Sequence, residues 1–130
     1  MIFIDTIGGN EKQRKLVTDV AYWCVNRLMP RMKKLEIEIQ INNLKDRAVG
    51  YCMMQDDNRT FELEVDKKLG VEEMIVTVCH EMVHVKQYAR NELGINDNHD
   101  NEDYFDLPYE KEAYGLQETL LEEYKNTGNI

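Results

Sequence analysis

The hydrophobic positions of the chain change their spacing several times, and each spacing predicts one element. Between residues 16 and 28 apolar side chains recur at the spacing of a helix, and Asn10 and Gln13 have the types and separation of a capping box. A helix is therefore predicted from about Asn10 to Pro30, because proline ends or kinks a helix.

Alternation of apolar and polar residues predicts strands in the middle of the chain. Residues 35–41 (LEIEIQI) alternate strictly, residues 48–54 form a less regular strand that contains Gly50, and residues 60–65 alternate again. The turn-forming residues 56–58 join the last two strands as a hairpin. Each strand has one apolar and one polar face, so we expect a small, mostly antiparallel sheet with helices on its apolar face.

Two further helices are predicted in the C-terminal half. Gly70 opens a helix that runs to about Arg90, with two glutamates in its first turn, where the helix dipole favours negative charge. Residues 94–107 are acidic and rich in turn formers, so we expect a loop there. Pro108 suits the first turn of a last helix that ends near Tyr124. The expected fold is one α+β domain over residues 1–130.

The charge is unevenly distributed and the chain as a whole is acidic. Its net charge is −9, with +3 in residues 1–50 and −12 in residues 51–130. Nucleic-acid binding depends on neutralising phosphates with Lys and Arg, so this balance argues against nucleic acid as the main partner. The short basic cluster of Arg27, Arg31, Lys33 and Lys34 is interpreted as a solvated helix end.

The sequence favours a cytoplasmic protein without membrane contact. No apolar run approaches the roughly 20 residues that span a bilayer, and residues 1–5 lack the basic start and long apolar stretch of a secretory signal. Cys24, Cys52 and Cys79 are widely spaced and form no Cys-x-x-Cys pair. They are expected to be small buried side chains in a reducing compartment, not a disulfide framework.

The strongest functional signal is the HExxH motif at residues 80–84. On a helix His80 and His84 lie one turn apart on the same face, so two neutral imidazoles can bind one Zn²⁺. Glu81 cannot easily share that ion with them, but it can take a proton from a water on the zinc. The motif lies within a strongly periodic helix and uses two of the three histidines of the chain. We therefore predict a zinc site with Glu81 as the catalytic base.

A catalytic zinc also needs a third protein ligand and an open position for water. Glu112 is the first choice, because the loop before the last predicted helix is long enough to bring that helix back across the site. His99, in the loop, is one alternative. Glu110 is another, although an acid in the first turn of a helix is more simply a helix-terminal residue. Asp100 and Asp103 are also left open.

Two stretches resemble a known group of proteins. Residues 78–87 (VCHEMVHVKQ) and 107–114 (LPYEKEAY) resemble small SprT-like metallopeptidases of phages and bacteria, and the Glu-x-Glu-Ala element is similar to ImmA/IrrE-type peptidases. The resemblance covers about residues 60–120 and implies a minimal zincin-like domain of gluzincin type, cytoplasmic in the host if phage-encoded. It implies that zinc is held by both motif histidines and by a glutamate of a later helix, here His80, His84 and Glu112.

A second resemblance keeps the histidine alternative open. The motif helix also resembles SprT and Spartan proteins, which use a third histidine that is usually followed by glycine. His99 has the matching spacing but is followed by Asp100, and the chain has no zinc-ribbon extension. These departures argue against a role in cutting DNA-bound proteins.

The resulting hypothesis is a zinc-dependent peptidase that acts on a protein or peptide substrate. By resemblance to zincins, the substrate would lie extended along an edge strand, here residues 48–54 or 60–65. Two alternatives are a zinc-containing binding module without turnover and an SprT-like protease acting beside DNA. Candidates for an oxyanion donor or for a carboxylate that orients a histidine are Tyr104, Tyr109, Tyr114, Asp103 and Asp106.

Overall fold

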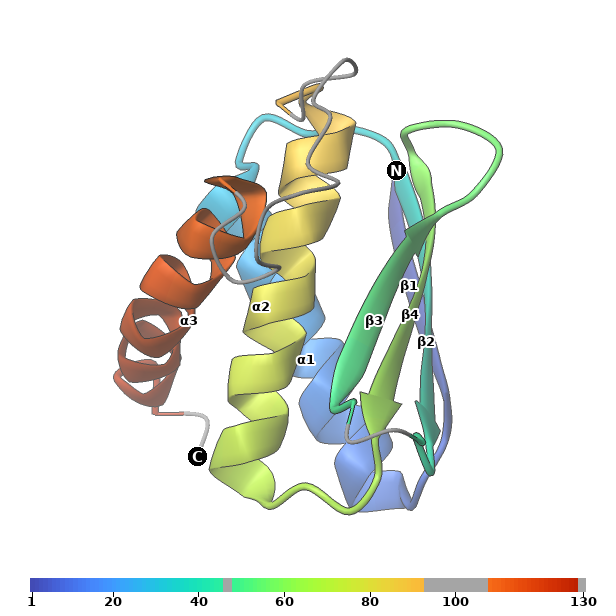
Figure 1. Ribbon diagram of the computed structural model, residues 1–130, viewed down its shortest axis with the longest axis vertical. Coiled ribbons are helices and arrows are strands. Elements are labelled where there is room, and N and C mark those ends of the chain that lie inside the picture. The colour runs from blue at the N-terminus through green and yellow to red at the C-terminus, as the bar shows by residue number, and fades with distance from the viewer. Residues whose placement is uncertain (46–47, 93–107, 129–130) are drawn as a thin grey trace.

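The computed structural model describes residues 1–45, 48–92 and 108–128, and Figure 1 shows their arrangement. Within these residues the chain is α+β, as expected, with four strands and three helices. In chain order they are β1 (Ile2–Gly8), α1 (Glu11–Leu28), β2 (Leu35–Asn42), β3 (Gly50–Met54), β4 (Thr60–Asp66), α2 (Val71–Ala89) and α3 (Pro108–Lys125).

The capping box predicted for the first helix is confirmed. The Asn10 side chain accepts a hydrogen bond from the Gln13 backbone N–H at 2.8 Å, and the Gln13 side chain accepts one from the Asn10 N–H at 2.9 Å. This reciprocal pair satisfies amides that the first turn of α1 leaves without helical partners. In the described residues, we find no helix with the length and apolar character needed to cross a membrane.

The expectation of a mostly antiparallel sheet is wrong. The four-stranded sheet of the described residues has the order β1-β2-β4-β3, in which β1 pairs parallel with β2, β2 pairs parallel with β4, and only β3 and β4 are antiparallel. Two features produce this arrangement. The additional strand β1 is connected to β2 through α1, and such a helical crossover makes neighbouring strands parallel. β4 then inserts between β2 and β3 while keeping the predicted hairpin.

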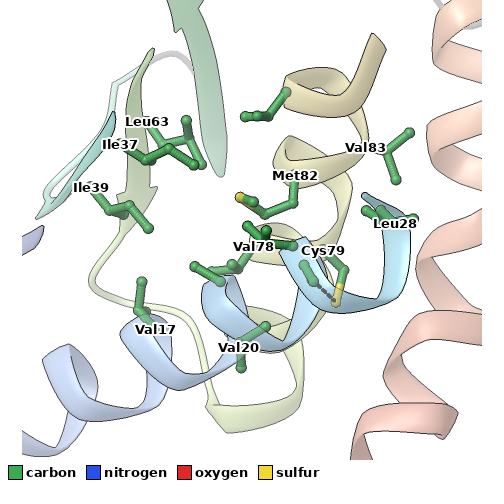
Figure 2. Close-up of a cluster of buried hydrophobic side chains, with 14 of the residues drawn as sticks. Val17, Val20, Leu28, Ile37, Ile39, Leu63, Val78, Cys79, Met82 and Val83 are labelled. Atoms are coloured by element: carbon green, nitrogen blue, oxygen red, sulfur yellow. Dashed lines mark hydrogen bonds between the residues drawn. The ribbon is translucent and has the colours of Figure 1, made fainter. Parts of the chain in front are cut away.

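The helices cover one face of the sheet in two layers. α1 and α2 lie against the sheet, and α3 packs on α2 away from it (Figure 1). Figure 2 shows the core between sheet and helices, where Ile37, Ile39 and Leu63 face Val78 and Met82 of α2. Because both sides of α2 are covered, it is the most deeply buried helix, and polar side chains on it must find partners inside the protein.

Two of the three cysteines take part in this core. Cys24 of α1 and Cys79 of α2 are fully buried free thiols whose sulfur atoms lie 3.7 Å apart, as the dashed line in Figure 2 marks. Cys52 of β3 is only partly buried. The expectation of small buried side chains is thus confirmed for Cys24 and Cys79.

Gly50 allows β3 to approach α2 closely. A Cβ atom at this position would lie 2.7 Å from Thr77 Cγ2, 3.0 Å from Glu81 Oε2 and 3.2 Å from the Glu64 carbonyl oxygen. Contacts this short require the strand or the helix to shift. The absence of a side chain at Gly50 therefore sets how near the start of β3 comes to the HExxH helix.

We expect Gly50→Ala to destabilise the fold by about 1–3 kcal/mol, because the added methyl group overpacks the contact between β3 and α2. Gly115→Ala is the matched control. In the described part of the chain, no atom outside the neighbouring backbone of α3 lies within 4 Å of a Cβ at Gly115, so removing a helical glycine there should stabilise by about 0.5–1 kcal/mol. Urea denaturation of both variants measures the difference. If Gly50→Ala left the fold as stable as Gly115→Ala does, β3 and α2 would have room to move apart.

Candidate metal centre

The two motif histidines project from α2 into a buried space. His80 and His84 are 7% and 8% exposed, and their Nε2 atoms lie 3.2 Å apart. Their separation by one helical turn places them on the same face, as the sequence predicts. Two imidazoles buried at this distance need a hydrogen-bonded or charged partner between them.

That partner is Glu110, in the first turn of α3. Its Oε1 lies 3.1 Å from His80 Nε2 and 2.9 Å from His84 Nε2, and the residue is 1% exposed. The possible ligand atoms of the three residues all lie within 4.8 Å of one another. We call His80, His84 and Glu110 the candidate metal centre.

The spacing of these atoms fits a small tetrahedral metal ion. With bonds of about 2.0–2.1 Å to nitrogen or oxygen, two ligands of a tetrahedral ion lie about 3.3–3.4 Å apart. The three observed separations of 2.9, 3.1 and 3.2 Å are close to this value. Two nitrogens and one carboxylate oxygen would fill three corners, which leaves the fourth for water.

Two glutamines fix the orientation of the imidazoles. Gln117 Oε1 lies 2.8 Å from His80 Nδ1, and Gln87 Oε1 lies 2.8 Å from His84 Nδ1. Gln87 Nε2 donates to the Tyr109 carbonyl at 2.9 Å and to Glu112 Oε1 at 2.7 Å, and both of these groups are acceptors. The Gln87 amide can therefore take only one orientation, in which its oxygen accepts the Nδ1 proton of His84. The Nε2 lone pair of His84 is consequently directed into the centre.

Glu112, the first choice for the third ligand, lies outside this group. Its carboxylate accepts hydrogen bonds from Gln87 Nε2 and from Lys86 Nζ, the latter at 2.8 Å. Glu110 and Glu112 are two residues apart, so they lie about 200° apart around α3 and cannot both face the histidines. The structure thus places Glu110 where the sequence analysis placed Glu112, and Glu112 supports Gln87 instead.

A helical pattern in the sequence could have identified Glu110. Glu110, Ala113 and Gln117 are spaced by three and four residues, and they share the face of α3 that meets α2. Ala113 is fully buried there. Glu110 was interpreted from the sequence as a helix-terminal acid, and this pattern was therefore not used. The alternatives His99, Asp100 and Asp103 lie outside the described residues.

Glu81 lies beside the centre, on a small pocket. The pocket has a volume of about 160 Å³ and is lined by residues 50–52 of β3, by Glu81 and His84 of α2, and by Tyr109 and Glu110 of α3, among others. Burial raises the pKa of Glu81 to about 7, although His80 and His84 lower it. A carboxyl group that titrates near neutrality is suited to accept and return a proton.

The pKa of His84 is also shifted. Burial lowers it, but hydrogen bonds to Glu110 and Gln87, together with nearby carboxylates, outweigh burial and raise it above its ordinary value. In the protein without a metal ion, a proton on His84 can therefore neutralise part of the charge of Glu110. The same arrangement favours a cation between the two side chains.

The tyrosines and aspartates considered as oxyanion donors or as partners of a histidine fall into two groups. The Tyr114 ring centroid lies 4.5 Å from that of His80, and the Tyr109 ring centroid lies 6.0 Å from that of His84. Tyr104, Asp103 and Asp106 lie outside the described residues. Glutamines thus stand where the sequence analysis expected a carboxylate beside the histidines.

Comparison with known proteins adds no information about family. No protein-family model matches the chain, and searches of curated proteins and of solved structures gave no match. The inferences about function therefore depend on the site itself.

The raised pKa of Glu81 predicts a pH-dependent effect of Glu81→Gln in the metal-free protein. The folded-state pKa of about 7 exceeds the ordinary glutamate value of 4.5, so stability from this group is present below pH 4.5 and is lost as the pH rises through 7. A glutamine side chain has nearly the same shape as the glutamate it replaces, but it does not titrate. Its stability advantage over Glu81 should therefore grow between pH 4.5 and 8, by an amount on the order of 3 kcal/mol.

Urea denaturation of chelator-treated proteins over this pH range tests the prediction. Glu118→Gln makes the same chemical change at an exposed position of α3 and is the control for removing a surface carboxylate. A constant difference for Glu81→Gln would mean that the buried carboxyl group titrates normally.

Proposed function

We propose that this protein is a zinc-dependent peptidase of minimal zincin-like fold. The observation that carries the proposal is the convergence of His80 Nε2, His84 Nε2 and Glu110 Oε1 within hydrogen-bonding distance, beside the buried Glu81. Two imidazoles and one carboxylate are a donor set that suits zinc, whereas Mg²⁺ and Ca²⁺ prefer oxygen ligands alone. Gln87 and Gln117 hydrogen-bond the ring nitrogens that point away from the centre, as is typical of metal-binding histidines.

The chain's own residues supply the proton transfers. When bound, zinc makes water a better nucleophile near neutral pH and polarises the carbonyl group of a peptide. The Glu81 carboxylate takes a proton from the attacking water as the new C–O bond forms. It passes this proton to the amide nitrogen as the C–N bond breaks, which regenerates the carboxylate. Glu81 lines the pocket between β3, α2 and α3, where we place the scissile peptide bond.

β3 is the proposed binding strand for an extended substrate. In the described part of the chain, β3 is paired on one edge only. The bonds from Asp66 N–H to the Val49 carbonyl and from Gln55 N–H to the Thr60 carbonyl set the alternation of the ladder. The backbone groups of residues 50, 52 and 54 therefore point away from β4. A peptide paired there would lie above the HExxH helix, which favours residues 48–54 over residues 60–65.

Zinc binding distinguishes Glu110 from Glu112. We expect Glu110→Gln to weaken zinc binding by more than about a hundredfold, because a ligand is lost. Gln87→Met should weaken it by about 10–100-fold, because His84 loses the partner that fixes its ring. Glu112→Gln should cost less than about tenfold, since an amide oxygen can still accept a hydrogen bond from Gln87. Competition with a chromophoric chelator measures each affinity.

Glu118→Gln is the matched control, because its side chain is exposed on α3, and it should leave zinc affinity unchanged. A larger loss for Glu112→Gln than for Glu110→Gln would restore Glu112 as the ligand. If all of these variants still bound zinc stoichiometrically, the candidate metal centre would not be the zinc-binding site.

Hydrolysis is tested with the zinc-loaded protein and a mixed-peptide library read by mass spectrometry. We expect cleavage by the wild type and at least about a hundredfold slower cleavage by Glu81→Gln, with zinc retained, because the base that activates water is removed. Glu118→Gln should cleave as the wild type does. A wild type that binds zinc but cleaves neither these peptides nor unfolded casein would favour the alternative of a binding module without turnover.

A further inference from the structure

A second cavity lies at the end of the molecule where α2 ends and β2 and β4 begin. It has a volume of about 590 Å³, and five cationic side chains line it: Arg31, Lys33, Lys34, Arg59 and Arg90. They come from three separate parts of the chain: the connection from α1 to β2, the residue before β4, and the C-terminal end of α2. We call this the basic cavity.

Carboxylates beside the basic cavity balance only part of its charge, since backbone hydrogen bonds and, among other groups, Lys34 lower the pKa of Asp57, and Glu92 pairs with Arg90. Among the described residues, no acidic side chain lines it. Glu92 lies 3.4 Å from Arg90 Nε, but it is shared with Lys86 at 3.1 Å. Asp57 accepts hydrogen bonds from the Arg59 backbone N–H at 2.9 Å and from the Thr60 hydroxyl at 3.1 Å. Five cations therefore converge in a chain whose net charge is −9.

Support of the helix end explains only part of this cluster. Arg59 Nη1 donates to the Ala89 carbonyl at 2.7 Å and to the Asn58 carbonyl at 3.0 Å, and Arg90 is the C-cap of α2. Cations are favoured at a helix C-terminus by its dipole. Arg31, Lys33 and Lys34 follow the C-terminal end of α1 at exposed positions. Their place after α1 does not account for their lying around the same cavity as Arg59 and Arg90.

We propose that the basic cavity binds a small phosphate-bearing ligand. A phosphate group concentrates up to two negative charges on one centre, and several cations from different segments can share them, with arginine able to bind through two N–H groups. Met29 and Met32 provide an apolar wall next to the cations. That wall suits a ligand with an apolar ring beside its phosphates, such as a nucleotide.

The rest of the surface favours a short ligand over a polymer. The outer face of the sheet carries exposed acids on neighbouring strands, including Asp5, Glu36 and Glu38. A long polyanion that left the cavity would meet this negative potential within a few Debye lengths. The proposal goes beyond the peptidase activity and does not depend on it, because none of its residues belongs to the candidate metal centre.

Calorimetric titration at low ionic strength tests the proposal with inorganic tripolyphosphate, a nucleoside triphosphate and a 15-nucleotide single-stranded DNA. We expect binding of phosphate probes, and a loss of at least about tenfold in Lys33→Glu/Lys34→Glu. Lys12→Glu/Lys15→Glu is the control, because it makes the same change of net charge at exposed positions of α1 and should cost less than about twofold. Lys33→Gln/Lys34→Gln serves if the charge reversal prevents folding.

The three probes distinguish the source of the phosphate. Tighter binding of the nucleoside triphosphate than of tripolyphosphate would identify a nucleotide, whereas tightest binding of the oligonucleotide would point to nucleic acid and overturn the proposal of a small ligand. The proposal is overturned if the wild type binds none of the probes. It is also overturned if both double charge variants lose affinity equally, or if a hexaglutamate peptide binds more tightly than tripolyphosphate.

Discussion

Three electron-rich atoms held about 3 Å apart inside the protein are the constraint on which the candidate site depends. His80 Nε2, His84 Nε2 and Glu110 Oε1 are all buried, and burial removes the water that would otherwise solvate them. Such a group is stable only with a positive charge among its members, supplied by a proton or by a metal ion. Against the effect of burial, hydrogen bonds to Glu110 and Gln87 raise the pKa of His84 and so favour a proton there, while the Gln87 hydrogen bond to Nδ1 leaves the Nε2 lone pair available to bind a metal ion.

Much of the surrounding fold keeps these atoms in place. α2 packs against the sheet and α1 on one side and against α3 on the other, and its polar face meets Glu110 and the small pocket. Ala113 lets α3 approach α2, and Gly50 lets β3 approach Glu81. Both are positions where a larger side chain would separate the elements that build the site.

The sequence predicts those features that depend on neighbours along the chain. The capping box of α1, the hairpin of β3 and β4, and the helical spacing of His80 and His84 are local, and the structure confirms them. Features that depend on three-dimensional packing were missed. β1 gave no alternation strong enough to identify it, since Phe3 and Ile7 are exposed, and without it the parallel pairs could not be foreseen.

The same distinction explains why neither Glu110 nor the basic cavity was singled out from the sequence. The choice between Glu110 and Glu112 depends on the rotation of α3 about its axis, which follows from the burial of Ala113 and Leu120 and not from the spacing to the HExxH motif. The basic cluster of Arg31, Lys33 and Lys34 looked like a solvated helix end. Arg59 and Arg90, distant in sequence, lie around the same cavity, and only the three-dimensional structure brings them together with this cluster.

Polar contacts link the candidate metal centre to the basic cavity, but the small energies of these contacts indicate that the two act nearly independently. One chain of polar contacts joins them: His84, Gln87, Glu112, Lys86, Glu92 and Arg90. The ion pairs in this chain include side chains that are 32%, 36% and 54% exposed, and exposed pairs contribute about 0–1 kcal/mol. An anion that drew Arg90 away from Glu92 could therefore change zinc affinity by no more than about fivefold. Because this is smaller than the effect expected from losing a metal ligand, loss of zinc binding in a variant can be assigned to the candidate metal centre itself.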